Sequence, residues 1–357
     1  MTHNLGDSVK WSFDSAPNGF HRTAGAGADM TANMSADHVH VACVSNAGFV
    51  PHFATMLNSL AASNPPEKVT VHLLHDDSVT PDMQDRLREL AHRQGLSLGF
   101  LQPTDTLLAQ LPPRSSHYPS IVWYRILLPE LLSHVDRVLY IDADTLVMQD
   151  LRSVWSMDLG DALLAAVAQP KAWSQTPAHR ARIQLSPDAH YLNSGVILMN
   201  LRQMRNEGAT AKILAVGHSH AAQLSDATEF SFMDQDALNS ACADRWLRLH
   251  PKWNSLASIY LAGNVEEFLD GEHQFAEAAA SPGIVHFEGS VFAKPWNYRC
   301  LHPLQHLYLA YRRDTPWPLE QLEDAGLTSK LLRPLPPRLQ LWLAEMKHRV
   351  LRMLRQK

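Results

Sequence analysis

Short apolar runs and segments with helical periodicity alternate along the chain from about residue 38 onward. The apolar runs, which predict strands, cover residues 38–44, 69–74, 96–101, 137–141, 191–201 and 284–287. Helical spacing falls at 51–62, 124–132 and 234–243, with a kink or break expected at Pro129. A further helix is predicted to open at Thr80-Pro81, with the threonine as its N-cap. Strands that alternate with helices predict an α/β fold with a parallel sheet and right-handed crossovers.

The two ends of the chain differ in pattern from its middle. Residues 1–36 are rich in Gly, Ala, Ser, Asn and Asp, which is typical of a flexible leader. Residues 301–337 are predicted to form a helical extension that ends at a proline-rich break. Residues 338–357 combine an apolar stripe with six basic residues and the single acid Glu345, which predicts a basic amphipathic helix. Such a helix is suited to peripheral contact with an anionic membrane, and the alternative is a terminal helix that packs on its own domain.

Composition narrows the class of protein. The 357 residues carry a net charge of −5 at pH 7, so there is no basic excess to recruit nucleic acid. The three cysteines are an odd number and lie far apart, which fits neither a disulfide framework nor a zinc site and favours a reducing compartment. There is no apolar stretch of about 18 residues and no signal sequence. We therefore expect a cytoplasmic protein, either soluble or peripheral at the inner face of the cytoplasmic membrane.

The main candidate for chemistry is the sequence Asp142-Ala143-Asp144, directly after the apolar run 137–141. Sheets of α/β proteins bind ligands at the carboxyl ends of their strands, so both carboxylates are expected at a binding edge. Hard oxygen ligands of this kind suit Mg²⁺ or Mn²⁺, and such an ion can bridge a diphosphate and neutralise a departing nucleotide. The alternative is a pair of acids that cap a turn, since Asp-x-Asp is common by chance.

A second group of residues follows the apolar run at 284–287. The imidazole of His286 lies at this strand end and is suited to complete the protein ligands of the metal. Gly289 permits close approach of the backbone to a ligand, and Lys294 can meet a diphosphate as a point charge. Taken alone, a histidine near a lysine is more often structural.

Three other segments offer side chains for a sugar or a phosphate. Asn193, at the start of an apolar run, can donate to and accept from a sugar hydroxyl, or can form a turn. Asp234-Gln235-Asp236 places two acids and an amide at a predicted helix start, where Asp234 is an N-cap or the group grips a hexose. Arg125 is suited to a donor phosphate, to a carboxylate or to a surface ion pair.

In chain order, these motifs resemble those of glycosyltransferase family 8, over roughly residues 38–300. The resemblance implies a GT-A fold, with a Rossmann-like, nucleotide-binding mixed sheet in a domain of residues 37–300. It also implies a retaining, metal-dependent enzyme that moves galactose or glucose from a UDP-sugar donor. The chain looks most like lipopolysaccharide galactosyltransferases and glucosyltransferases, which implies a saccharide or lipid-linked glycan acceptor. The basic tail is similar to the membrane-attaching tail of those enzymes.

The resemblance also implies roles for individual residues. Asp142 and Asp144 match the acid pair that binds Mn²⁺ or Mg²⁺, and His286 matches the third protein ligand of that ion. Positions that bind the donor are matched by Val44, Asn46, Phe49, Arg125, Asp142, Ala143, Asn193, Ser194, Gly289 and Lys294. Asp234 and Gln235 match residues that hold the donor sugar and face its anomeric carbon, and we group Asp236 with them as a candidate catalytic residue.

Four positions depart from the family pattern. The first strand ends in Val44-Ser45-Asn46-Ala47-Gly48-Phe49, where the family usually has an Asp-rich segment. Asn46 then stands for an aspartate, and Phe49 for a tyrosine that stacks on the base. Glu288 replaces a small residue, and Gln169 lies where an acceptor-binding aspartate is expected. The first two differences concern the nucleotide, and the last two concern the acceptor.

The reaction mechanism and two rival functions stay open on the sequence. Gln235 is a neutral amide and a poor nucleophile, which favours front-face attack, although Asp234 and Asp236 are candidates for a transient covalent role. One rival is a nucleotide-sugar-binding protein without activity. The other is a metal-dependent nucleotidyltransferase, which would usually have a glycine-rich phosphate loop where this chain has only Gly48. The absence of a Gly-x-Ser-x-Gly elbow disfavours a hydrolase with a catalytic triad.

Overall fold

The computed structural model describes residues 38–113, 119–170, 176–223, 233–261, 272–344 and 346. The described residues all belong to one compact unit. The predicted leader at 1–36 lies outside the described residues, as do residue 345 and residues 347–357 of the predicted terminal helix. The beginning of that helix is described, because residues 337–344 are helical. No helix of the described residues is long and apolar enough to cross a membrane.

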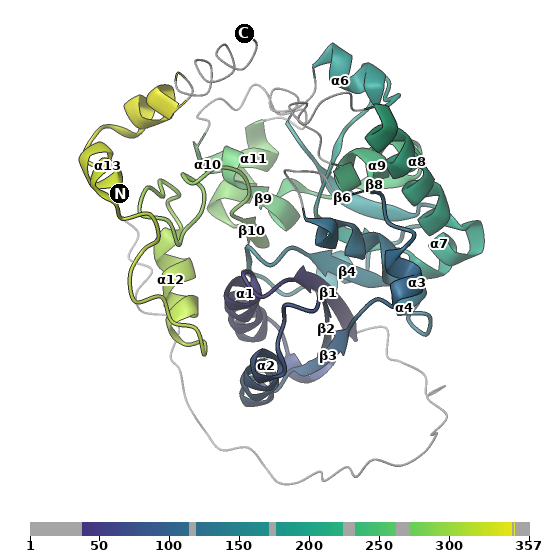
Figure 1. Cartoon of the computed structure of the whole chain (residues 1–357), viewed down its shortest axis with the longest axis horizontal. Helices are drawn as coiled ribbons and strands as arrows, with labels where there is room; N and C mark the ends of the chain where they lie inside the picture. The colour runs from purple at the N-terminus through teal and green to yellow at the C-terminus, as the bar shows by residue number, and fades with distance from the viewer. Residues whose placement is uncertain are drawn as a thin grey trace. The chain divides into compact units, whose positions relative to one another are not determined.

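A seven-stranded sheet forms the centre of the compact unit (Figure 1). Its strands, in spatial order, are β3 (Ser97–Leu101), β2 (Val69–His75), β1 (Val39–Ser45), β4 (Val138–Ile141), β7 (Leu192–Met199), β6 (Leu164–Ala168) and β8 (Trp246–Arg248). The strands β1 to β4 are parallel, as the sequence predicts, whereas β7 runs antiparallel to both β4 and β6. This reversal makes the sheet mixed, as the resemblance to GT-A enzymes implies.

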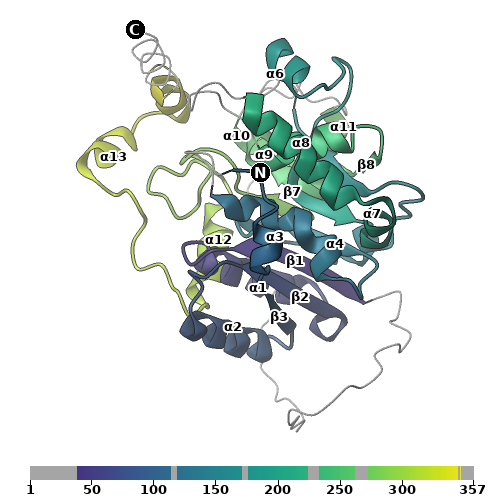
Figure 2. The same cartoon turned by 45° about the vertical axis from the view of Figure 1, so that its right-hand side comes forward.

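Helices cover both faces of this sheet (Figures 1 and 2). One face packs against α1 (Val50–Ser63) and α2 (Pro81–Arg93). The other face packs against η2 (Ser120–Leu127), α4 (Leu128–Leu131), α7 (Leu201–Glu207), α8 (Ala209–Gln223) and α9 (Met233–Ala241). Side chains of β1 alternate between the two cores, with Val41 and Cys43 on the first face and Ala42 on the second. A strand buried on both faces explains why the apolar run at 38–44 is almost continuous.

A second, three-stranded sheet brings distant segments together beside the first. Its order is β5 (Thr145–Val147), β10 (Ile284–His286) and β9 (Ser255–Leu256). The strand β10 is antiparallel to β5 and parallel to β9, which sets His286 opposite Thr145 on one side and Leu256 on the other. The other labelled helices of the described residues are η1 (Pro66–Lys68), α3 (Asp105–Leu108), α5 (Arg152–Trp155), α6 (Pro177–Arg182), η4 (Pro251–Asn254), α10 (Ala257–Leu261), α11 (Glu272–Ala280), α12 (Gln305–Arg313) and α13 (Leu327–Leu332), besides the helical residues 337–344.

Two expectations about helix starts and breaks are confirmed, and one is wrong. The side chain of Thr80 accepts a hydrogen bond from the amide of Met83, which confirms it as the N-cap of α2. The helical segment predicted at 124–132 is broken next to Pro129, as expected, because the 3-10 helix η2 ends at Leu127 and α4 begins at Leu128. Pro129 occupies the first turn of α4, where it costs no hydrogen bond. Of the two roles that the sequence leaves open for Asp234, the N-cap is wrong, because α9 begins at Met233 and this acid lies within the first turn.

Candidate metal and donor site

The turn between β4 and β5 carries the acid pair and is fixed by backbone hydrogen bonds. The amide of Asp142 donates to the carbonyl of Gly195 at 2.8 Å, and the amide of Phe287 donates to the carbonyl of Asp144 at 3.0 Å. The hydroxyl of Thr145 closes the turn by donating to the carbonyl of Asp142 at 2.8 Å. The predicted position of the two acids at a strand end therefore holds, and β7 and β10 support it from either side.

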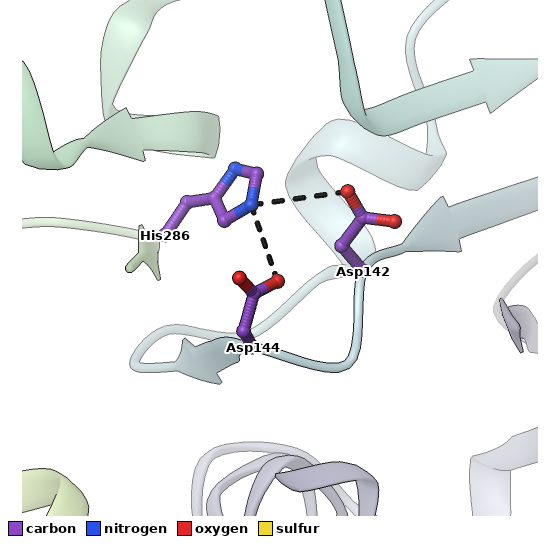
Figure 3. A group of neighbouring side chains, drawn as sticks. All are labelled: Asp142, Asp144 and His286. Carbon is purple, nitrogen blue, oxygen red and sulfur yellow. Dashed lines mark ion pairs between the residues drawn. The ribbon is translucent and has the colours of Figure 1, made fainter. Parts of the chain in front are cut away.

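Three side chains converge at this turn (Figure 3). The Nε2 atom of His286 lies 3.8 Å from Asp142 Oδ2 and 3.4 Å from Asp144 Oδ1. One ligand atom from each residue lies within 4.8 Å of the others. Asp144 and His286 are buried, and Asp142 is half-buried, so the group is reachable from one side. Two carboxylates and one imidazole fit a divalent cation such as Mn²⁺ or Mg²⁺.

Lys294 adds a positive charge to this group, with its Nζ atom 2.6 Å from Asp144 Oδ2. Burial opposes ionisation of Asp144, but Lys294 and His286 hold its pKa well below the usual range. Burial likewise opposes protonation of His286, but Asp144 and Asp142 raise its pKa. Asp144 is therefore a carboxylate at neutral pH, which is the form that binds a metal. We name Asp142, Asp144, His286 and Lys294 the metal corner.

Gly195 leaves the space that His286 occupies. A Cβ atom at this position would lie 2.2 Å from Cε1 of the imidazole and 2.6 Å from its Nδ1. Both distances are far below van der Waals contact, so a glycine is required here for close packing of β7 against His286. This role of Gly195 could not be predicted from the sequence, because the contact joins two strands from different sheets.

Arg125 links the metal corner to the start of α9. Its guanidinium forms ion pairs of 3.2 Å with Asp142 and with Asp234, and it donates to the carbonyl of Ser194 at 2.6 Å. It also lies over the ring of Tyr140, whose hydroxyl donates to Asp142 Oδ1 at 2.5 Å. Burial opposes its charged form, but the adjacent acid Asp142 raises the pKa of Arg125 overall. The arginine is buried, so the alternative of a surface ion pair is wrong.

Neutral amides line the next part of the site. The backbone amide of Ser194 donates to Gln235 Oε1 at 2.8 Å. The other end of the Gln235 side chain donates to Gln169 Oε1 at 3.0 Å and to the hydroxyl of Tyr191 at 3.2 Å. Asn239 pairs with both backbone groups of the first residue of β7, at 2.7 and 3.0 Å. We name this surface the amide wall, and it consists of Asn193, Ser194, Gln235 and Asn239.

The two acids of the candidate catalytic set have different surroundings. Asp234 keeps a side-chain exposure of 11%, and burial raises its pKa to about 6 although Arg125 opposes the shift. Asp236 is fully buried and binds the hydroxyl of Tyr191 at 2.6 Å and His179 Nε2 at 2.9 Å. It also forms an ion pair of 3.4 Å with Arg182 of α6. Asp236 thus connects α6 to the amide wall, whereas Asp234 faces Arg125.

Residues 40–300 match the family described as Glycosyl transferase family 8. The chain belongs to glycosyltransferase family 8. It is 29% identical to General stress protein A of Bacillus subtilis (strain 168) over 281 residues, which cover 78% of this chain and 94% of that protein. It is 24% identical to the lipopolysaccharide 1,2-glucosyltransferase of Escherichia coli (strain K12) over 246 residues, or 67% of this chain and 68% of that one.

A solved structure of the galactosyltransferase LgtC, in complex with donor and acceptor sugar analogs, has the same fold. It superposes with a TM-score of 0.65 at 20% sequence identity and covers 78% of this chain and 96% of that chain. The family 8 chain described here therefore has the GT-A fold that the sequence predicted. At this level of identity the likeness concerns the fold, and the roles of single residues depend on the geometry of this chain.

The residues expected near the nucleoside lie at the carboxyl end of β1, the neighbour of β4 in the sheet. Val44 is half-buried, and Asn46 Oδ1 accepts a hydrogen bond from the amide of Phe49 at 3.1 Å. The ring of Phe49 is 41% exposed and meets His52 edge to face, so one surface of it is available for stacking. Asn46 therefore supports the loop that presents Phe49.

The remaining predicted positions lie around the metal corner. Ala143 is buried between the two acids. Gly289 has a φ of +89°, a conformation that favours glycine. Glu288 is half-buried, and burial raises its pKa although His286 and Lys294 act in the opposite direction. Sequence reasoning missed Tyr140 and Tyr191, because a tyrosine in an apolar run gives no sign that its hydroxyl holds an acid.

Proposed function

We propose that this family 8 protein is a retaining hexosyltransferase that uses a UDP-sugar donor and Mn²⁺ or Mg²⁺. The main support for this proposal is the arrangement of the site. The ligand set Asp142, Asp144 and His286 lies beside a lysine and directly adjoins a buried wall of amides. The first feature suits a metal and a diphosphate, and the second suits the hydroxyls of a sugar.

The residues of the metal corner would hold the leaving group. Asp142, Asp144 and His286 would bind the cation, which when bound neutralises charge on the diphosphate. Lys294 already lies within 2.6 Å of Asp144, so its ammonium is close enough to share the same phosphate oxygens. The strand-end loop at Gly289 lets the backbone approach the same group.

The amide wall supports front-face substitution at the sugar. Both ends of the Gln235 side chain are engaged in hydrogen bonds, so it serves to orient the sugar and not to attack it. Asp236 is fully buried, and Asp234 is paired with Arg125. In the proposed step, the bond between the anomeric carbon and the phosphate oxygen breaks while the acceptor oxygen bonds to the same face. The acceptor proton passes to the departing phosphate oxygen.

The names of relatives support the choice of sugar and acceptor. One similar protein is named a lipopolysaccharide 1,2-glucosyltransferase, and the structural neighbour LgtC is named a galactosyltransferase. We therefore propose glucose or galactose as the sugar and a saccharide of lipopolysaccharide or another surface glycan as the acceptor.

We propose that the protein works at the inner face of the cytoplasmic membrane. Leu327 and Leu331 of α13 are 77% and 69% exposed, and Trp342 is 54% exposed. Leu327 and Leu331 precede the basic pattern of residues 338–357 and Trp342 lies within it, a combination suited to an anionic lipid surface. The full chain should sediment with vesicles that contain phosphatidylglycerol and not with phosphatidylcholine vesicles. Binding of equal strength to both kinds of vesicle, or to neither, would contradict the membrane proposal.

The central test is calorimetric binding of UDP with Mn²⁺ and with a chelator. Wild type is expected to bind UDP at least about 100-fold more tightly with Mn²⁺, and Asp144→Ala should remove that gain. Asp150→Ala is the matched control, because this half-buried acid pairs only with Arg152 in the part of the chain that the structure describes. UDP binding that depends neither on Mn²⁺ nor on Asp144 would show that the acid pair does not bind the metal. Hydrolysis assays with UDP-glucose and UDP-galactose would then identify the donor.

A further inference from the structure

Asn254 is a buried residue that touches both the metal corner and the amide wall. It has no exposed surface and ends η4, directly before β9. Its Nδ2 atom donates to Asn193 Oδ1 at 2.8 Å, and its Oδ1 atom lies 2.9 Å from Nδ1 of His286. The pairing of β9 with β10 holds it there, since Leu256 is in register with His286.

The direction of these hydrogen bonds follows from one backbone donor. The amide of Gly195 donates to Asn193 Oδ1 at 2.9 Å, and a backbone N–H can only donate. The atom of Asn193 that faces Asn254 is therefore an oxygen, so Asn254 must present its amide nitrogen to it. The carbonyl oxygen of Asn254 then faces His286. An oxygen without a hydrogen can only accept, so Nδ1 of the imidazole carries the proton.

The position of that proton decides what the opposite ring atom can do. In a neutral imidazole with a proton on Nδ1, the Nε2 atom carries the free lone pair. This Nε2 atom is the one that lies 3.4 Å from Asp144 and 3.8 Å from Asp142. Figure 3 shows the imidazole turned so that this nitrogen faces both acids.

We infer that Asn254 is a positioning residue that fixes the tautomer and ring orientation of His286 for metal binding. The inference rests on the proposed function, since it assigns a second layer of residues to the same metal. Asn193 orients the side chain of Asn254 by a hydrogen bond. A residue of the amide wall therefore determines, through Asn254, the orientation of the metal ligand His286. Partners of this kind commonly change metal affinity by about 10- to 100-fold when removed.

The test compares two substitutions that both lose the hydrogen bond to Asn193. Asn254→Asp keeps an oxygen that accepts from His286 Nδ1, whereas Asn254→Leu keeps none. We would measure Mn²⁺ affinity of the full chain by electron paramagnetic resonance, with Mn²⁺ alone and with UDP. Asn254→Leu is expected to weaken Mn²⁺ binding about 10- to 100-fold, and Asn254→Asp to bind at least about 10-fold more tightly than Asn254→Leu.

A control separates this role from general loss of structure. Asn64 is another buried asparagine, which holds the amide of Leu151 at 2.7 Å away from the metal corner. Asn64→Leu should lower the unfolding temperature to an extent comparable with Asn254→Leu and leave Mn²⁺ affinity within about 2-fold of wild type.

The possible results distinguish failure of the role of Asn254 from failure of the proposed function. Equal Mn²⁺ affinity in wild type and Asn254→Leu, or equal losses in the Leu and Asp variants, would overturn the role of Asn254 alone. Wild-type protein that binds no Mn²⁺, with or without UDP, would overturn the proposed function and this inference together.

Discussion

The metal corner and the amide wall adjoin each other, but they satisfy their buried polar atoms in different ways. In the metal corner, charge is balanced by charge, with Asp144 between Lys294 and His286. In the amide wall, neutral groups pair with neutral groups and with backbone, as Gln235 does with Ser194. Arg125 joins the two regions through Asp142 and the carbonyl of Ser194.

The difference indicates which region depends on the ligand. Ion pairs at a half-open corner can be exchanged for a cation and a diphosphate, because the charges stay balanced. A network of neutral hydrogen bonds keeps its shape whether or not a sugar is bound, since the side-chain amides of the wall already have acceptors among the described residues. The corner should therefore respond to metal and salt, and the wall to substitutions that break its network.

The largest effect is expected from Asp236→Ala, which removes the acceptor that anchors the wall to α6. Arg182, His179 and the hydroxyl of Tyr191 would all lose a buried partner. We expect the free energy of unfolding to fall by about 3–5 kcal/mol in urea titrations. Asp136 is an exposed acid that pairs with Arg202 and Arg205, and Asp136→Ala should cost less than about 1 kcal/mol. A similar loss in both variants would show that Asp236 does not hold the wall.

A second substitution, Gly195→Ala, should act mainly on the metal corner, since the added atom would lie 2.2 Å from the imidazole of His286 and 3.0 Å from Asn193 Oδ1 of the amide wall. A methyl group in Gly195→Ala would collide with His286, so the imidazole must leave the acids. We expect Mn²⁺ affinity to fall about 10- to 100-fold in calorimetry. Gly326→Ala is the control, because nothing lies within 4 Å of the added atom. Unchanged affinity in Gly195→Ala would mean that His286 does not bind the metal.

The smallest effect is expected on the way in which stability depends on pH. Burial raises the pKa of Asp234 to about 6, so the folded protein favours its protonated form. This contribution is present at pH values below the usual pKa of an aspartate and is lost as the pH rises through about 6. Asp234→Asn should therefore be more stable than wild type by about 2 kcal/mol at pH 8 and nearly equal to it below pH 4. Unfolding temperatures across this range measure the difference, and a gap that does not change with pH would refute it.

The sequence could predict the acids and the central strands because both depend on local pattern. Asp142 and Asp144 follow a buried apolar run, and carboxyl ends of neighbouring strands share one edge of a sheet. The strand β5 has only three residues, too few for a pattern. Its pairing with β10, and hence the neighbours of His286, could not be derived from spacing.

Roles that depend on packing could not be predicted from the sequence either. Asp234 and Asp236 have the same chemistry and lie two residues apart on one helix, where they face different directions. Only the packing of α6 shows that Asp236 binds His179 and Arg182 while Asp234 faces Arg125. Asn254 likewise looked like any other polar residue, because its partners Asn193 and His286 are 61 and 32 positions away.

The small sheet of β5, β10 and β9 has a consequence for how this chain folds. Asp144 and Lys294 are 150 positions apart, and β10 brings them together only after it has paired with β5. Contacts across such distances form late, because the entropy of closing a long loop is lost before the contact compensates for it. We therefore expect the metal ligands to be assembled late in folding, so that a divalent cation does not nucleate the process. It would instead bind the finished chain and slow its unfolding, with a gain in stability that rises with the concentration of the ion.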